Sequence, residues 1–554
     1  MPGDDRLSNL PDDLLRRVLY FAPAREAQST SALSRRWRGL CCSTGAVNLH
    51  ESVPEDVYDV PFFSRRDAFV SAARLSLEAA AADGIPVTRF TFHLEPARHI
   101  NAVHKFLHSE SDWRSRSTDV VSELLSLPAT RRVQELRLAA EYSGHDMSLD
   151  REIRSLDPCF DTLEFTSLPS ETLRVLDIAS CSFFRPAASV AFPRLASLRL
   201  SRSSISSEHL EDFVHAAPVL ATVHLESVMF HPPPEEQRLT IRLHFPAATV
   251  LVLDKCSWGE KIYDGSSGTT ALEIDAPRLR RFTYKGLLRR LSLSRQAPDL
   301  AQIELHILPF VYRGRHKDAR HDLVKFWRIL HNFSNTRELK LRVDLLQAIA
   351  VVSSASRAEL LCSFRNLERL ELEGRLAHNE KAAAVSIANL LQCCPMLRDL
   401  RINLTTSNAN MDTCADQGRC YLEKKYRQDL HNSIHGCNNR TSIASADYDH
   451  DGDAILQDKY LSKLPAALTR HVFQCLQSSL TCVRLQFRLE TRISRVKLTK
   501  TFGVKLIKFF AENAMLLKEM LIDAGNEKMC GHINSKVQKW ASGKSFLVLP
   551  LERR

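Results

Sequence analysis

The sequence predicts an α/β fold in which a short helical module at the amino terminus precedes an irregular solenoid of strand repeats. Three observations predict it: an apolar helix pattern near the start, a recurring apolar-x-x-apolar-x-apolar pattern in the middle, and a return of strand and helix patterns close to the carboxyl terminus. With 554 residues the chain is long enough for several domain equivalents and a large core.

The helical module is predicted to contain three short helices. The first begins at Pro11, in a position where proline costs no hydrogen bond. Pro23 ends this helix and opens the second, and Ser34 can cap a third helix that carries Trp37. The first helix is predicted to present one apolar stripe, made of Leu14, Leu15, Val18 and Leu19. Such faces are too small for a core of their own, so we expect them to be buried against another protein.

These residues resemble the F-box. The matching pattern consists of Leu10-Pro11, Leu14-Leu15, Val18, Arg25-Glu26-Ala27 and Leu33-Ser34-Arg35-Arg36-Trp37-Arg38. The resemblance implies that the helices dock onto a Skp-type adaptor and, through it, a cullin-containing ubiquitin ligase. The adaptor-binding residues that it implies are Leu10, Pro11, Leu14, Leu15, Val18, Leu19, Leu33, Ser34, Arg35, Trp37 and Arg38.

Two positions depart from the F-box pattern of plant proteins. Ala22 stands where these proteins usually carry Leu, and Cys41 where they often carry Trp. Both departures remove apolar surface, and each is expected to weaken docking by about a kcal/mol.

The middle of the chain repeats one short strand pattern. Examples are Leu173/Leu176/Ile178, Leu195/Leu198/Leu200, Leu220/Val223/Leu225 and Leu397/Leu400/Ile402. Many units recur at about 20 to 30 residues, which is the period of leucine-rich repeats. Around Leu293 the interval between successive repeat units is too short to contain a helix, so we predict only strands and turns there. Polar residues such as Arg199, His224 and Arg401 should point outward from their strands.

The carboxyl end resembles the FBD-type module that accompanies plant F-box and leucine-rich repeat proteins. The resemblance is carried by Leu480–Phe487, Lys508–Ala514, Leu517–Met520 and Phe546–Pro550. We expect this module to continue the repeats and to cap the last one, because an open solenoid end exposes core residues.

The chain is therefore divided into five predicted segments. They are an F-box at 4–46, a helical and strand linker packed on the repeats at 47–127, leucine-rich repeats at 128–404, a polar and partly disordered insertion at 405–463, and the FBD-like module at 464–554.

The insertion contains two motifs that mimic metal sites. The stretch from Asp447 to Asp458 resembles a calcium loop, but it lacks a preceding helix and the bidentate Glu. Zinc-ligand types also occur there without the tight cysteine pair of zinc sites, at Cys414, Cys420, His431, His435 and Cys437. We predict a solvated acidic loop, and no metal or cofactor.

Composition gives the expected compartment and limits the partners. The net charge of +10 is mild for this length, and the basic residues between Arg278 and Arg295 are predicted to form a solvated outer face, with a polyanion site as the alternative. The 14 cysteines lack framework spacing, and we find no signal peptide or membrane span. Reduced thiols in the cytoplasm or nucleus are expected.

The leading functional hypothesis is a non-catalytic substrate-recognition subunit of a Skp–cullin–F-box ubiquitin ligase. The F-box would bind the adaptor, and the repeats would bind an unknown target protein. No phosphate loop, nucleophile elbow or zinc-protease motif indicates an enzyme, so we assign no catalytic residues. The alternatives are a non-ligase scaffold that binds the adaptor and a repeat protein that binds nucleic acid.

Overall fold

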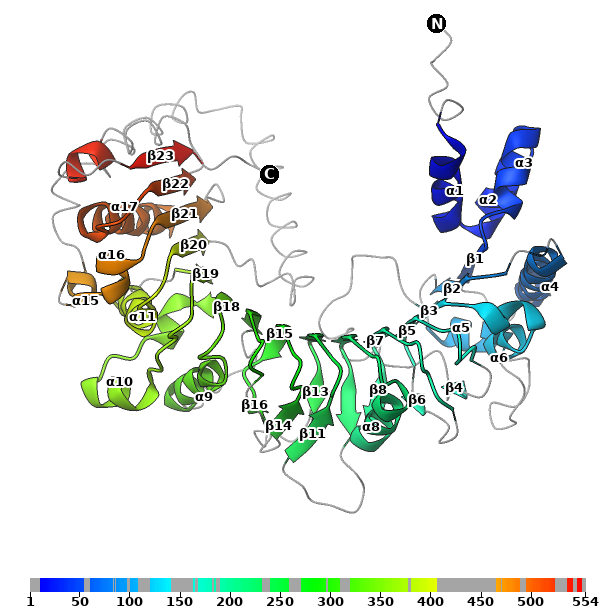
Figure 1. Cartoon of the computed structure of the whole chain (residues 1–554), viewed down its shortest axis with the longest axis horizontal. Helices are drawn as coiled ribbons and strands as arrows, with labels where there is room; N and C mark the ends of the chain where they lie inside the picture. The colour runs from blue at the N-terminus through cyan, green and yellow to red at the C-terminus, as the bar shows by residue number, and fades with distance from the viewer. Residues whose placement is uncertain are drawn as a thin grey trace, which may run out of the picture. The chain divides into compact units, whose positions relative to one another are not determined.

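The computed structural model describes residues 10–53, 60–82, 84, 86–96, 100–107, 120–140, 163–164, 168–181, 184–185, 190–231, 240–258, 271–294, 297–308, 319–376, 380–405, 465–469, 471–488, 495–523, 536–541 and 546–550. The chain forms two compact units, Met1–Pro277 and Arg278–Arg554, and each is described below by itself. Figure 1 shows the arrangement of helices and strands within each unit.

The first unit begins with a three-helix module composed of α1 (Asp12–Phe21), α2 (Ala24–Thr30) and α3 (Arg35–Cys42). Pro11 is the N-cap of α1, and Asp12 and Asp13 lie in its first turn, where they complement the helix dipole. Pro23 is the N-cap of α2. The Ser34 hydroxyl accepts a hydrogen bond from the Trp37 N–H, which confirms the predicted cap of α3.

A parallel sheet follows the module. Its strands pair in the order β1 (Ala46–Val53), β2 (Arg89–Pro96), β3 (Glu135–Ala140), β5 (Val175–Ala179), β7 (Ser197–Ser201), β9 (Thr222–Glu226) and β12 (Val250–Asp254). The strands stack without register shifts, so Leu136, Leu176, Leu198 and Val223 lie beside one another in the core. The alternation predicted from the sequence is confirmed, with Arg199 and His224 facing away from the buried residues.

Helices and minor strands occupy the return segments of the first unit. The helices are α4 (Val60–Ala82), α5 (Ile100–Leu107), α6 (Val120–Leu125), a 3-10 turn at Pro128–Arg132, and α8 (Ser207–Ala216). Leu210, Phe213 and Val214 of α8 are buried, as the sequence predicted. The minor strands are β4 (Leu163–Glu164), β6 (Phe184–Arg185), β8 (Ser204–Ser206), β10 (Met229–His231), β11 (Thr240–His244), β13 (Ser257–Trp258) and β14 (Ala271–Asp275).

Each of four neighbouring strands of this sheet is followed by a residue in the left-handed backbone conformation. Ser180, Arg202, Ser227 and Lys255 have φ of 66°, 45°, 52° and 52°. The Ser180 N–H donates to Ser201 O, the Arg202 N–H to Glu226 O and the Ser227 N–H to Asp254 O, so these three turns are bonded to the next strand. The turns at Arg202, Ser227 and Lys255 direct the chain from the main sheet into the second parallel ladder β8–β10–β13, whereas Ser180 precedes β6 of the β4–β6 ladder.

The second unit continues the same construction. Its strands pair in the order β15 (Arg281–Leu287), β17 (Gln302–Leu308), β18 (Glu338–Leu345), β19 (Arg369–Arg375), β20 (Asp399–Thr405), β21 (Cys482–Arg488), β22 (Glu519–Asp523) and β23 (Leu547–Pro550). Its helices are α9 (Ala319–His331), a 3-10 turn at Leu346–Ile349, α10 (Ser354–Leu360), α11 (Glu380–Cys393), α15 (Ala466–Thr469), α16 (Gln474–Ser478) and α17 (Arg495–Asn513).

One predicted repeat unit is not a rung of this sheet. Leu291 and Leu293 lie in β16 (Leu291–Leu293), but β15 pairs directly with β17. The physical reason is length, since a crossover between parallel strands needs about a dozen residues or more. Only a short turn separates Leu287 at the end of β15 from Leu291.

The predicted linker and the predicted FBD-like module both contribute strands to the parallel ladder. The linker contributes β1 and β2 to the main sheet, so the strand ladder begins before the repeat signature does. At the other end, β21, β22 and β23 of the predicted FBD-like module extend the parallel sheet. The metal-like motifs of the insertion, from Cys414 to Asp458, lie outside the described residues.

Candidate functional site

The apolar residues of α1 form two separate rows. Leu15 and Leu19 are buried in the core, with exposed fractions of 0% and 3%. Leu14, Val18 and Phe21 are exposed by 48%, 51% and 57%. Because these three follow at intervals of four and three residues, they lie on one face of the helix. The four residues of the predicted stripe, Leu14, Leu15, Val18 and Leu19, therefore divide between a buried row and an exposed row.

The module also has a core of its own, contrary to expectation. Leu15, Leu19, Ala27, Trp37 and Leu40 form one buried cluster. Leu10 and the two departures from the F-box pattern, Ala22 and Cys41, are partly buried against this cluster. The smaller side chains at these two positions therefore act first on the packing of the module itself.

The predicted adaptor-binding residues divide between surface and core. Leu14, Val18 and Leu33 offer exposed apolar surface, with Leu33 exposed by 70%. Pro11, Ser34, Arg35 and Arg38 are also exposed. Leu15, Leu19 and Trp37 belong to the core cluster, so their role is to hold the surface residues in place.

Arg36 joins the start of α1 to α3. Its guanidinium group lies 2.7 Å from Asp12 Oδ1 and donates to Leu10 O at 2.6 Å. The amino-terminal end of α1 is thereby fixed to α3 by a charged hydrogen bond and a backbone contact.

The junction between module and sheet is polar and largely buried. The Asn48 amide, on β1, donates to Tyr20 O at 2.9 Å and to Ala22 O at 3.0 Å. These carbonyls lie at the carboxyl end of α1, where helical partners are missing. Asn48 therefore caps α1 from the first strand of the sheet.

Arg89, on β2, completes the junction. Its side chain is 7% exposed and lies 2.7 Å from Glu135 Oε2, and its Nε donates to Asn48 Oδ1 at 3.3 Å. The guanidinium group also lies over the rings of Tyr20 and Phe21, at 5.2 and 4.8 Å from the centroids. One buried cation thus contacts α1, β1 and β3 together.

Sequence reasoning missed Phe21, Asn48 and Arg89. The spacing of Phe21 from Leu14 and Val18 is a helical signal that could have placed it on the exposed row. Asn48 and Arg89 carry no such signal, because a polar residue in an alternating strand is normally expected to face solvent.

The second unit presents a face covered by ion pairs, formed by the outward residues of β17 to β21. Asp399 lies 3.1 Å from Arg369 and 3.0 Å from Arg401, and Arg484 approaches it at 4.0 Å. Lys340 lies 3.5 Å from both Glu304 and Glu371. Arg401 faces outward, as predicted, but its charge is shared with its neighbours.

On the first unit, the outward residues Arg199 and Glu226 form an ion pair of 2.8 Å. Partial burial and the neighbouring Arg199 charge both lower the pKa of His224. Partial burial works to raise the pKa of Glu226, but the hydrogen bond and charge of Arg199 leave it lowered. This part of the face therefore carries a neutral imidazole and a firmly ionised carboxylate at neutral pH.

Within the described ranges, no group of three or more His, Cys, Asp or Glu side chains is arranged to hold a metal ion. Among the helices described, none is both long and apolar enough to cross a membrane.

The fold and the surface together define a class, a parallel-strand solenoid repeat protein with an amino-terminal three-helix module. Family models match two parts of the chain: the F-box domain over residues 7–45, and the leucine-rich repeats of the FBD-associated F-box protein At5g56370 over residues 121–301.

Relatives from Arabidopsis thaliana extend the match. The chain is 24% identical to F-box/FBD/LRR-repeat protein At5g22660 over 73% of this chain and 77% of the relative. It is 27% identical to F-box/FBD/LRR-repeat protein At5g22700 over 51% of this chain and 54% of the relative. The chain is thus similar to plant F-box, leucine-rich repeat and FBD-type proteins.

Proposed function

We propose that this protein is the substrate-recognition subunit of a Skp–cullin–F-box ubiquitin ligase. In this proposal the three-helix module binds a Skp-type adaptor, and the sheet of repeats binds a protein target. The F-box match supports the first half, since F-box domains typically bind such adaptors. The role requires no chemistry from the chain itself.

The observation that carries the proposal is the exposed row on α1. Leu14 and Val18 leave about half of their surface in water although the module has a complete core beneath them. Burying a leucine or valine completely contributes about 1.5 to 3 kcal/mol, so each of these half-exposed residues can add about 1 kcal/mol to association. A small apolar row on a folded module is typical of a protein–protein contact.

The buried junction supports the second half of the proposal. Asn48 and Arg89 fix the module to β1 and β2 through hydrogen bonds and ring contacts. A target held at a fixed distance from the ubiquitin carrier gains in effective concentration, whereas a loose tether would dilute it.

The test is capture of a Skp-type adaptor by the full chain carrying Leu14→Glu and Val18→Glu. Both side chains are exposed, so the fold should persist while the apolar contact gains two uncompensated charges. We expect capture to fall by about tenfold or more. Leu75→Glu is the matched control, because Leu75 is an exposed leucine (65%) on α4, outside the module, and should leave capture unchanged.

A second variant separates folding from contact. Leu15→Ala removes a fully buried side chain and should destabilise the module by about 2 to 5 kcal/mol, with loss of capture that follows loss of helix. Undiminished adaptor capture by the folded double variant would contradict the proposed docking surface. Failure of the intact chain with adaptor and cullin to support ubiquitin transfer to any bound target would contradict the ligase role.

A further inference from the structure

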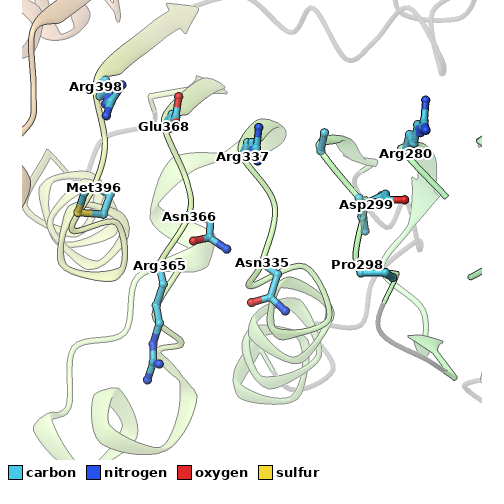
Figure 2. A pocket seen from close by; sticks show the side chains of 12 residues that line it. Arg280, Pro298, Asp299, Asn335, Arg337, Arg365, Asn366, Glu368, Met396 and Arg398 are labelled. Carbon is cyan, nitrogen blue, oxygen red and sulfur yellow. The ribbon is translucent and has the colours of Figure 1, made fainter. Parts of the chain in front are cut away.

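A groove of about 680 Å³ runs along the edge of the second unit where its strands begin. Its upper row is formed by the residues that precede successive strands, and Figure 2 shows Arg280, Arg337, Glu368 and Arg398 in this row. Backbone hydrogen bonds join the row from rung to rung, from Ala301 to Arg280, from Arg337 to Ala301 and from Arg398 to Glu368. The groove is thus a regular product of the parallel ladder.

The arginines of this groove are exposed and lack carboxylate partners within the described residues. Arg280, Arg337, Arg365 and Arg398 all line the groove and are exposed. No ion pair of these four guanidinium groups occurs among the residues that the structure describes, although Asp299 and Glu368 line the same groove. By contrast, Arg369 and Arg401, on the neighbouring strands, have carboxylate partners at 3.0 to 3.2 Å.

The spacing of the arginines is regular. Arg280 precedes β15, Arg337 precedes β18, and Arg398 precedes β20, so each neighbour in this series is two strands away. Strands lie about 4.8 Å apart, which puts successive arginines on rungs about 9.6 Å apart. A polyproline II segment rises about 9.3 Å per turn of three residues, so its residues i, i+3 and i+6 match this spacing.

We propose that this groove binds an extended acidic segment of the target protein, with carboxylates at every third residue facing Arg280, Arg337 and Arg398. The inference rests on the proposed function and names the class of target that it would recognise. The Asn366 side chain, which lies in the lower row in Figure 2, offers an amide donor and acceptor to a peptide backbone. Met396, 44% exposed, offers an apolar contact beside it.

The lining favours a peptide over a nucleic acid. Among the described residues that line the groove, none has an aromatic side chain on which a base could stack. Asp299 and Glu368 would also repel a continuous run of phosphates, whereas a peptide with neutral residues between its carboxylates can pass them.

The experiment measures binding of a fluorescent twelve-residue peptide, (Glu-Pro-Ala)4, to the full chain in complex with its adaptor. A second peptide of the same composition carries its four glutamates in one block. We expect the period-three peptide to bind more tightly, and Arg280→Glu/Arg337→Glu/Arg398→Glu to weaken it by about tenfold or more. Binding should also weaken as salt is raised.

The matched control is Arg131→Glu/Arg132→Glu/Arg174→Glu. These are exposed arginines of the first unit, without ion pairs among the described residues, and the control changes the net charge by the same amount. It should alter peptide affinity by less than about threefold. Equal losses in the two triple variants, equal binding of the two peptides, or tighter binding of a twelve-nucleotide DNA strand would overturn the proposal.

Adaptor capture by the groove variant distinguishes this inference from the proposed function. If the groove variant captures the adaptor normally and peptide binding is unaffected, the acidic-segment proposal fails and the ligase proposal stands. If the Leu14/Val18 variant still captures the adaptor, the docking surface fails whatever the peptide does. Circular dichroism is the check that each triple variant is folded.

Discussion

The Arg89 guanidinium lies 4.8 Å from the centre of the Phe21 ring, so the end of the first helix and the second strand of the repeat sheet share one contact. The same guanidinium is paired with Glu135 on β3. Because Phe21 also belongs to the exposed row of α1, the surface proposed to meet the adaptor is in direct contact with the repeat sheet.

Replacing Arg89 should loosen the module without altering its surface. Arg89→Ala removes the buried cation and leaves the Glu135 carboxylate without this partner, at a cost of about 3 kcal/mol. We expect amide hydrogens of α1 to α3 to exchange faster, while adaptor affinity changes little. Hydrogen-exchange mass spectrometry with peptide resolution measures this directly.

Arg89→Lys is the control for Arg89→Ala. Lysine keeps the charge but loses the planar stacking on Tyr20 and Phe21, so an intermediate effect is expected. Unchanged exchange in α1 to α3 for both variants would show that the junction does not hold the module.

Asp399 should be the most important carboxylate of the ion-paired face. Its side chain is 15% exposed and lies between Arg369, Arg401 and Arg484. Asp399→Asn leaves three crowded guanidinium groups without that charge, and we expect a loss of about 2 kcal/mol in the free energy of unfolding. Glu304→Gln, at a site 47% exposed with one lysine partner, should cost less than about 1 kcal/mol. Equal costs in urea titrations would contradict this ranking.

Two glycines should respond oppositely to alanine. A Cβ on Gly374 would lie 2.8 Å from Leu346 Cδ2 and 2.9 Å from Leu346 Cγ, so Gly374→Ala should destabilise the protein by about 1 to 3 kcal/mol. Gly39 lies within α3 and has no atom within 4 Å of its Cβ position, so Gly39→Ala should stabilise the helix by about 1 kcal/mol. Thermal unfolding of both variants checks the signs.

Buried thiols should make the protein less stable at high pH. Cys256 is buried and its thiol donates to Leu225 O at 3.2 Å, and burial raises the pKa of this thiol from 9.0 to about 12. The unfolded chain ionises first, so the contribution of this thiol is complete below pH 9 and declines as the pH rises towards 12. Unfolding should be easier at pH 10 than at pH 8, by an amount on the order of 1 kcal/mol per such thiol.

Cys256→Ala isolates the contribution of this one thiol. The variant should be less stable at both pH values, but its free energy of unfolding should decline less between pH 8 and pH 10 than that of the parent chain, by an amount on the order of 1 kcal/mol. Parallel declines would mean that Cys256 ionises normally in the folded protein.

The strand ladder was predictable because it repeats. Alternating apolar residues such as Leu198 and Leu200 recur in each rung, and Ser34 is a cap residue directly before a helix pattern. The strand predicted around Leu293 is present as β16, but it is not a strand of the main sheet, because the connection from β15 is too short for a parallel crossover.

The docking surface was predictable only in part. Leu14 and Leu15 are adjacent, and each has an apolar partner four residues later, so periodicity could not decide which row is buried. The groove arginines are far apart in sequence, and only the pairing of β15, β17, β18, β19 and β20 brings them into one row. Arg89 looks like a solvated strand residue until α1 is placed over it.

The pairing of β20 with β21 has a consequence for engineering this chain. These strands align in register from Asp399↔Cys482 onward although a long stretch of sequence separates them. Because the entropic cost of closing a loop rises only slowly with its length, the register of β20 and β21 should tolerate changes in the length of the stretch between them as long as the buried side chains of α15 and α16 are kept.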